Sequence, residues 1–233
     1  MRREPRVLGL LKLAGFALML GCFSPVKSSG EQSGAKFESA HVRFEQNATD
    51  GDVEVVFEAV GADEGLARLR VEAPDGRVVA DFRAPEASTL GIRSFAFESP
   101  EPTDIAGLKA AYPEGVYRFS GATTAGQEFR GASTLSHKLP GVVTLLSPSG
   151  EDVAVRGTQI AWKPVSGVAG YILEIEQEDL DLKLMVELPG TQSSFSVPNG
   201  FLIPGKEFAL EIGSVSENGN ASFVETQFRT AKQ

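Results

Sequence analysis

Apolar and polar residues alternate along most of the chain from residue 41 onward. Val42 and Phe44, for example, alternate with Arg43 and Glu45. Because successive side chains of a strand point to opposite faces, a period of two predicts half-buried β-strands. The same pattern recurs in segments 53–58, 68–72, 78–83, 95–97, 117–119 and around Phe129. About seven strands at regular spacing are typical of an antiparallel sandwich.

Two local signals interrupt this series. Pro74-Asp75-Gly76 separates two alternating segments and predicts a hairpin turn. A helical period then replaces the alternation before Pro113, and Thr103 or Asp104 can cap its first turn. The apolar face of this segment carries Ile105, Leu108 and Tyr112. We expect a short helical insert that covers one end of the sandwich, where packing is its simplest role.

The second half alternates in the same way and carries landmarks of a known family. The landmarks are Pro148, Ile160-Ala161-Trp162-Lys163-Pro164, Gly170-Tyr171-Ile172-Leu173-Glu174-Ile175, Leu202-Ile203-Pro204-Gly205, Phe208-Ala209-Leu210-Glu211-Ile212, Asn218-Gly219-Asn220 and Phe228-Arg229-Thr230. On these residues the segment from Pro140 to Thr230 resembles a fibronectin type III domain. The resemblance implies a β-sandwich with Trp162 and Tyr171 at core positions.

Two positions depart from the pattern of that family. Phe208 stands where the family usually has tyrosine, so a hydroxyl that would bond to nearby backbone is missing, at a cost of about 1 kcal/mol. The final turn, Asn218-Gly219-Asn220, contains no Arg-Gly-Asp. The resemblance therefore does not imply integrin-type adhesion.

The first half is also similar to a family. Asn47-Ala48-Thr49-Asp50-Gly51-Asp52, Pro113-Glu114-Gly115-Val116-Tyr117-Arg118-Phe119 and Leu135-Ser136-His137-Lys138-Leu139-Pro140 resemble the N-terminal sandwich of uncharacterised secreted bacterial proteins that carry a fibronectin type III module behind it. This resemblance implies a division into two domains and implies no activity. The predicted fold class is all-β, with two tandem antiparallel β-sandwiches of the immunoglobulin-like or fibronectin type III-like kind.

The first 21 residues have the layout of an export signal. Arg2-Arg3-Glu4-Pro5-Arg6 is basic, residues 7–20 are apolar apart from Lys12, and Gly21-Cys22 follows with the only cysteine of the chain. This segment resembles a bacterial lipoprotein signal, which implies cleavage before Cys22 and lipidation of that residue. An ordinary secretory signal, cleaved at Val26-Lys27-Ser28, is the alternative. A permanent membrane span is disfavoured, since the apolar run is short and contains Lys12.

These signals divide the chain into four segments. They are a lipoprotein signal peptide at 1–21, a flexible tether at 22–36, an N-terminal β-sandwich domain with a short helical insert at 37–138, and a fibronectin type III domain at 139–233, with the joint near Leu139-Pro140-Gly141. We expect a protein that is held by membrane lipid through acylated Cys22 in the bacterial cell envelope. Phe23 favours the outer membrane by family resemblance, and the protein is secreted if Cys22 is not lipidated.

The chain is acidic, with a net charge of −9 from 22 basic and 31 acidic residues. Loss of residues 1–21 removes four bases and one acid, so that 18 bases and 30 acids remain and the net charge becomes −12. Such a surface repels phosphate backbones and gains nothing from counterion release. We therefore predict no nucleic-acid partner. The charge favours solubility outside the cytoplasm.

Residues that could carry out catalysis are few. His41 fits an alternating strand, and His137 lies beside Ser136, whose side chain would point the opposite way in a strand. Neither histidine belongs to a nucleophile motif, and together with Cys22 they do not make a zinc ligand set. We predict no enzymatic activity and no cofactor. Paired carboxylates of the glycosidase kind meet only in space, so the sequence leaves them open.

Asn47, Asp50 and Asp52 have the spacing of the start of a calcium loop. Val55 stands where that loop requires glycine, so a hairpin turn is the better interpretation. A second acidic run is interpreted as a solvated loop and consists of Glu176, Glu178, Asp179 and Asp181. No metal site is predicted.

A protein of this kind acts by binding or by its position. The candidate binding residues, chosen by loop position, are Ser166, Gly167, Glu217, Asn218 and Gly219. The first hypothesis is a protein partner in the cell envelope. The second is a carbohydrate- or polymer-binding module, which needs an exposed aromatic platform, and Phe201, Phe223 and Tyr112 are its candidates. The third is a structural spacer.

Overall fold

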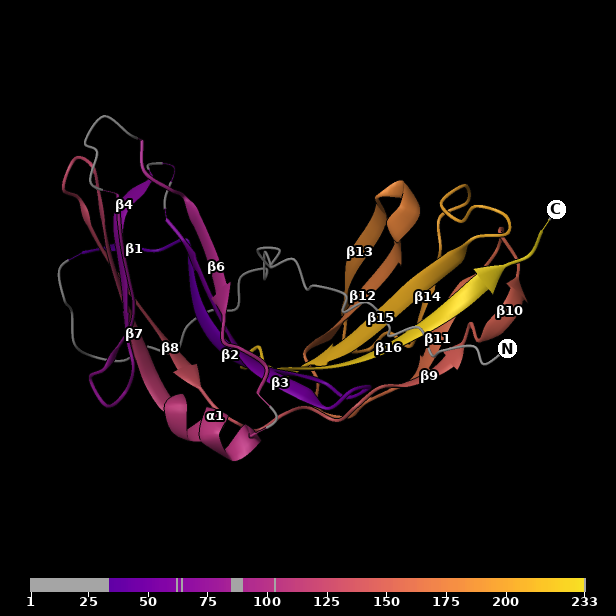
Figure 1. Ribbon diagram of the computed structural model, residues 1–233, viewed down its shortest axis with the longest axis horizontal. Coiled ribbons are helices and arrows are strands. Elements are labelled where there is room, and N and C mark those ends of the chain that lie inside the picture. The colour runs from indigo at the N-terminus through magenta and orange to yellow at the C-terminus, as the bar shows by residue number, and fades with distance from the viewer. Residues whose placement is uncertain (1–33, 62, 64, 85–89, 103, 233) are drawn as a thin grey trace, which may run out of the picture.

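The computed structural model describes residues 34–61, 63, 65–84, 90–102 and 104–232. Cys22, the predicted signal peptide and most of the predicted tether lie outside the described residues. The described chain forms two β-sandwiches that lie beside each other (Figure 1). This architecture confirms the predicted all-β class with two sandwiches.

The first sandwich packs a five-stranded sheet against three strands of a longer sheet. The five-stranded sheet has the order β1-β8-β7-β4-β5, formed by β1 (Ala35–Lys36), β8 (Glu128–Leu135), β7 (Gly115–Thr123), β4 (Leu66–Glu72) and β5 (Val78–Arg83). The strands opposite are β2 (Ser39–Asn47), β3 (Asp52–Val60) and β6 (Ser94–Glu98). The predicted turn at Pro74-Asp75-Gly76 joins β4 to β5, as the antiparallel pairing of these strands requires.

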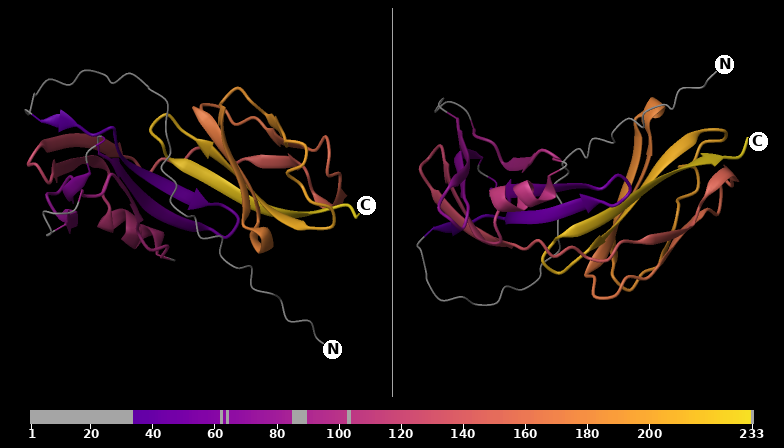
Figure 2. Two further views of the ribbon diagram at one scale, coloured as in Figure 1. Left: turned by 90° about the horizontal axis from the view of Figure 1, so that it is seen from above. Right: turned by 60° about the horizontal axis from the view of Figure 1, so that its bottom comes forward.

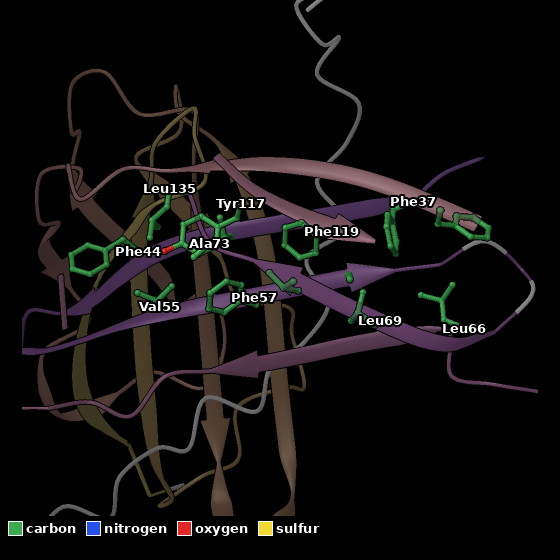
Figure 3. Close-up of a cluster of buried hydrophobic side chains, with 14 of the residues drawn as sticks. Phe37, Phe44, Val55, Phe57, Leu66, Leu69, Ala73, Tyr117, Phe119 and Leu135 are labelled. Carbon is green, nitrogen blue, oxygen red and sulfur yellow. The ribbon is translucent and has the colours of Figure 1, made fainter. Parts of the chain in front are cut away.

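Aromatic side chains fill the core of the first sandwich (Figure 3). Phe57 stacks on Phe97 with ring centroids 5.1 Å apart, and Tyr117 meets Phe57 edge-on at 5.7 Å. The hydroxyl of Tyr117 donates to the carbonyl oxygen of Pro113 at 3.1 Å. Burial raises the pKa of Tyr117 to about 12. This bond pins the start of β7 to the segment before it, which is the role of a tyrosine corner.

The predicted helical insert is α1 (Ile105–Ala111), and it lies at one end of the first sandwich (Figure 1). The Asp104 side chain caps it by accepting from the backbone N–H of Gly107 at 2.9 Å. Leu108 is buried, whereas Ile105 is exposed, so the prediction that both residues share a packed face is wrong. No helix in the described part of the chain is long and apolar enough to cross a membrane.

The second sandwich packs three strands against four. The smaller sheet has the order β14-β11-β9, formed by β14 (Ser194–Ser196), β11 (Gln159–Lys163) and β9 (Thr144–Ser147). The larger sheet has the order β13-β12-β15-β16, formed by β13 (Leu182–Pro189), β12 (Gly170–Gln177), β15 (Glu207–Val215) and β16 (Ala221–Thr230). The short strand β10 (Gly150–Val153) pairs with β16, and the single turn of 3-10 helix η1 (Glu178–Leu180) precedes β13.

The core of the second sandwich contains the residues that the family resemblance places there. Trp162 and Tyr171 are both buried and meet edge-on, with ring centroids 5.2 Å apart. Phe208 is also buried and stacks on Phe228 at 5.6 Å. The Tyr171 hydroxyl accepts from the backbone N–H of Val165 at 2.8 Å. The order of the strands and this core make the second sandwich fibronectin type III-like.

The two sandwiches share one sheet. Strand β16 pairs in parallel with β2 over three residue pairs, and this joins the larger sheet of the second sandwich to β2, β3 and β6 of the first. Figure 2 shows the meeting point of the two sandwiches from two further sides. The sequence predicts a joint near residues 139–141 and gives no sign of this strand pairing.

Asn220 fastens the junction with a buried side chain. Its Oδ1 accepts from the backbone N–H of Phe44 at 2.9 Å. Its Nδ2 donates to the carbonyl oxygens of Ser136 and Lys138 at 2.7 and 3.0 Å. Three backbone groups of the first domain thus depend on one amide of the second, because buried polar groups need partners.

Two buried serines hold the linker between the domains. The hydroxyl of Ser222 donates to the carbonyl oxygen of Pro140 at 2.9 Å, and that of Ser214 donates to Gly141 at 2.6 Å. Both serines are fully buried. These bonds hold the linker against β15 and β16, so specific hydrogen bonds define the joint between the sandwiches.

The shared sheet is strongly curved. In Figure 1 its ends, β6 and β13, rise on the two sides of the junction strands β2 and β16. Glu187 on β13 and Glu58 on β3 are far apart in the strand order, yet the charge of Glu58 helps to raise the pKa of Glu187, after burial as the main cause. The outer faces of the two sandwiches therefore turn toward each other, and the sheet has a concave side.

Candidate functional site: the acidic face of the shared sheet

Glutamates gather on the concave side of the shared sheet. Residues paired on neighbouring strands share a face, and Glu174 on β12 pairs with Glu211 on β15, which pairs with Glu225 on β16. The three carboxylates form a row across three strands, which are about 4.8 Å apart. Like charges directly opposite each other destabilise a sheet. The row therefore lowers the stability of the sheet locally, and packing of the sandwich does not require glutamate at these positions.

A second row lies across the junction. Glu45 on β2 pairs with Glu54 on β3, and Glu45 is also the partner of Ala221 on β16. We name the two rows together the acidic face, which consists of Glu45, Glu54, Glu174, Glu211 and Glu225. It extends over both sandwiches, and it exists as one surface because β2 pairs with β16.

An apolar strip lies between the two rows. Phe223 on β16 stands two residues from Glu225 and two residues from Ala221, the partner of Glu45. The strip is a cluster of buried side chains that consists of Ile172, Val215, Ala221 and Phe223. A Cβ atom on Gly213 would lie 2.3 Å from the ring of Phe223, so the glycine makes room for this ring.

Two bases already occupy part of the acidic face. Arg43 forms ion pairs with Glu45 and, at 2.7 Å, with Glu58. Burial lowers the pKa of Arg43, but these two carboxylates outweigh burial and raise it above its ordinary value. Lys183 pairs with Glu174 at 2.6 Å. The face is therefore built to hold cationic side chains in carboxylate surroundings.

Three glutamates of the face, Glu54, Glu211 and Glu225, have no ion pair within the described part of the chain, and Glu225 accepts a hydrogen bond from Asn47. Burial, reinforced by the charges of Glu45 and Glu98, raises the pKa of Glu54 to about 8. Burial, reinforced by Glu174 and Glu225, raises the pKa of Glu211 to about 8. Both carboxyls therefore change charge near neutral pH, because desolvation and like charges both disfavour the ionised form.

Two carboxylate oxygens on this side of the sheet lack hydrogen-bond donors from the described residues. They are Oε1 of Glu211 and Oε1 of Glu58, and both residues are at least 95% buried, with exposed fractions of 4% and 3%. An unmet buried acceptor costs about 1 to 3 kcal/mol, and more when it is charged. Such a cost beside opposed glutamates marks these positions as a candidate site.

The chemistry open to this face is recognition of positive charge. Within the described residues no group of three histidine, cysteine, aspartate or glutamate side chains is placed to hold a metal ion. The face offers carboxylates, and it presents no nucleophile beside a base among the described residues. It suits a ligand that carries positive charge.

The loops predicted from the sequence lie at one end of the second sandwich. Ser166 and Gly167 form an exposed turn between β11 and β12, and Glu217 and Asn218 are exposed in the turn between β15 and β16. Gly219 in that turn faces the first domain, with its Cβ position 3.9 Å from Cβ of Arg43. The turn at 217–219 therefore lies beside the acidic face, whereas none of its residues belongs to that face.

The aromatic platform expected for polymer binding is not assembled. Phe223 is 4% exposed and lies under the junction, so its prediction as an exposed platform residue is wrong. Phe201 is half-buried against Phe208 at 6.1 Å, and Tyr112 packs against Phe57 at 5.9 Å. In an isolated fibronectin type III-like module Phe223 would stand on an outer sheet face, and the neighbouring strand β2 changes its surroundings.

The two histidines have structural surroundings. Nε2 of His137 donates to the carbonyl oxygen of Tyr112 at 2.8 Å, and the ring packs on Phe44 at 5.0 Å. His41 lies on the outer side of β2, where partial desolvation by its neighbours lowers its pKa despite the nearby charge of Glu58. The structure does not bring the two histidines together with a nucleophile.

The calcium-like residues form a turn. Oδ1 of Asn47 accepts from the backbone N–H of Thr49 at 3.0 Å, and Oδ1 of Asp50 accepts from Asp52 at 3.2 Å. Nδ2 of Asn47 also donates to Oε1 of Glu225 at 2.7 Å, across the junction. The predicted hairpin turn is confirmed, and it has a second role in joining the domains.

Comparison with known proteins adds the following. No protein-family model matches this chain, and no curated protein matches it. Among solved structures it is similar to a segment of two fibronectin type III domains from chicken tenascin, with 13% identity over 83% of this chain and 99% of that chain and a TM-score of 0.32. It is also similar to a tetra-tandem repeat in the extending region of a large adhesion protein, with 14% identity over 83% of this chain and 50% of that chain and a TM-score of 0.32. A third is the BSP domain of a biofilm-associated protein, with 14% identity over 84% of this chain and 30% of that chain and a TM-score of 0.29.

Proposed function

We propose that this chain is a non-enzymatic binding protein of the bacterial cell envelope, anchored by lipid at Cys22, and that it engages a protein partner through the concave side of its shared sheet. The observation that carries the proposal is the pairing of β2 with β16, which makes one curved surface out of two sandwiches. A site that is common to two modules needs this fixed geometry.

A spacer would not require this surface. Modules that only add length can be joined end to end by a linker, with polar outer faces that are free in water. Here the joint buries Asn220, Ser214 and Ser222 in specific hydrogen bonds and places opposed glutamates on a common face. Because these glutamates cost stability, a gain in binding explains why they stand there.

The partner side of the proposal is tested in cells by photocrosslinking. A benzoylphenylalanine residue is placed at Glu187, which is exposed on the concave side of β13, and in a matched strain at Arg118, which is exposed on the outer face of β7. We expect one reproducible protein adduct from position 187 and none from position 118. Equal adducts from both positions, or recovery of the uncrosslinked protein only, would overturn the proposal in favour of a polymer-binding module or a spacer.

The anchor is tested separately. Cys22→Ala removes the residue that would carry the acyl chains. We expect radioactive palmitate to label the unaltered protein and not the variant, and we expect the variant to leave the membrane fraction. Wild-type protein that is unlabelled and soluble outside the cytoplasm would instead support the secretory alternative, and it would leave the binding surface to be judged by crosslinking.

A further inference from the structure

We propose that the acidic face binds lysine and arginine side chains of a protein segment supplied by the partner. This inference rests on the proposed function and names the chemistry of its site. Positive side chains are the complement of the two glutamate rows.

The face already shows how it holds such side chains. Arg43 lies between Glu45 and Glu58, and Lys183 lies on Glu174. Each of these bases comes from the chain itself. Glu54, Glu211 and Glu225 remain without an ion pair among the described residues. Glu225 accepts from Asn47, so Glu54 and Glu211 are the positions at which cations from outside would be held.

The buried oxygens point to the same ligand. Oε1 of Glu211 has no hydrogen-bond donor among the described residues, and the side chain faces Glu174, Glu225, Glu45 and Lys183. Lysine is a compact donor of three hydrogens, and arginine offers a fork of donors to a carboxylate. A single such group would supply the missing donor and reduce the repulsion within the row at the same time.

The arrangement of the carboxylates favours a peptide side chain over a bare metal ion. Lysine and arginine carry their charge at the end of a long stem, so a single ammonium or guanidinium group can reach a recessed carboxylate. A divalent metal needs several oxygens around one point, and the described residues place no group of three side chains in that arrangement.

The test uses the full-length protein in detergent with a fluorescein-labelled peptide of eight lysines, and a peptide of eight glutamates as the negative probe. The variant is Glu54→Gln/Glu211→Gln, which keeps the shape of both side chains and removes both ionisable carboxyls. Binding is measured at pH 9, where both carboxyls are ionised in the wild type. The matched control is Glu151→Gln/Glu178→Gln, which removes two exposed charges elsewhere on the molecule. Thermal unfolding of all three proteins shows that each is folded.

We expect saturable binding of the lysine peptide to the wild type and to the control, and about tenfold or greater weakening in the Glu54→Gln/Glu211→Gln variant. Equal affinity in all three proteins would mean attraction to net charge only and would overturn the proposal. Tighter binding of spermine or calcium than of the peptide, with the same loss in the variant, would also overturn it, in favour of a small cation. These results concern the site, whereas crosslinking at position 187 concerns the existence of a partner, so the two failures are distinguishable.

Discussion

Asn220 shows how much of the junction depends on one side chain. Its side chain accepts a hydrogen bond from the N–H of Phe44 and donates to the carbonyl oxygens of Ser136 and Lys138, all of the first domain. We expect Asn220→Ala to lower the free energy of unfolding by about 3 kcal/mol, because it leaves buried backbone groups without partners. Urea unfolding followed by circular dichroism measures this. The control is Asn218→Ala in the same exposed turn, which we expect to cost less than about 0.5 kcal/mol; an equal effect of both would refute the role of Asn220.

Glu211 links stability to pH in the direction opposite to an ion-paired carboxylate. Its pKa is about 8 in the folded protein and near 4.5 in the unfolded chain, so the folded state binds the proton more tightly. The free energy of unfolding should therefore fall as pH rises from about 4.5 to about 8. Charges facing this carboxyl come from Glu174, Glu225, Glu45 and Lys183.

We accordingly expect Glu211→Gln to be more stable than the wild type at pH 8.5, with an advantage that shrinks toward pH 5. Urea unfolding at both values measures the difference. Glu151→Gln, at an exposed position, should show no such trend. A Glu211→Gln advantage that is the same at both pH values would show that its carboxyl does not take up a proton on folding.

At the scale of elements, β15 and β16 pack closely because position 213 on β15 is a glycine. The ring of Phe223 lies where a Cβ of Gly213 would be. We expect Gly213→Ala to cost about 1 to 3 kcal/mol in the free energy of unfolding, because the ring must move within a packed strip. Gly213→Ala/Phe223→Leu should recover part of the loss, and a double-mutant cycle measures the coupling. Simple addition of the two losses would count against the contact.

The sequence predicts these elements well and their partners poorly. Alternation identifies β2, β3, β12 and β15 because each buries one face in its own sandwich. The parallel pairing of β2 with β16 cannot be seen in the sequence. It joins two strands edge to edge, and this does not change the alternation of apolar and polar residues in either strand. The helical cap at Asp104 is local and was predictable, and the exposure of Ile105 depends on which sheet the helix meets.

The acidic face could not be predicted for the same reason. Glu45, Glu54, Glu174, Glu211 and Glu225 stand at positions that a strand pattern assigns to water, where glutamate is unremarkable. Only the register places them opposite one another, and alternation along a strand does not reveal that four of them are buried. Phe223 was misplaced because the neighbouring strand that covers its surroundings comes from the other half of the chain.

For the whole molecule, we expect the shared sheet to make the two sandwiches one cooperative unit. Trp162 is the single tryptophan and lies in the core of the second sandwich, so its fluorescence reports that sandwich. Phe57 lies in the core of the first, where truncation to alanine costs about 3 to 5 kcal/mol. If the sandwiches unfold together, Phe57→Ala lowers the urea midpoint of the Trp162 signal as much as that of circular dichroism.

Independent sandwiches would give the opposite result. The Trp162 midpoint would then stay at its wild-type value in Phe57→Ala while part of the circular dichroism signal was lost at lower urea. Val116→Ala, at an exposed position of the first sandwich, should leave both signals unchanged and controls for general effects of substitution. Because the acidic face takes residues from both sandwiches, the pairing of β2 with β16 that would couple their unfolding also holds the two glutamate rows at a fixed separation, and the proposed recognition of spaced charges requires that rigidity.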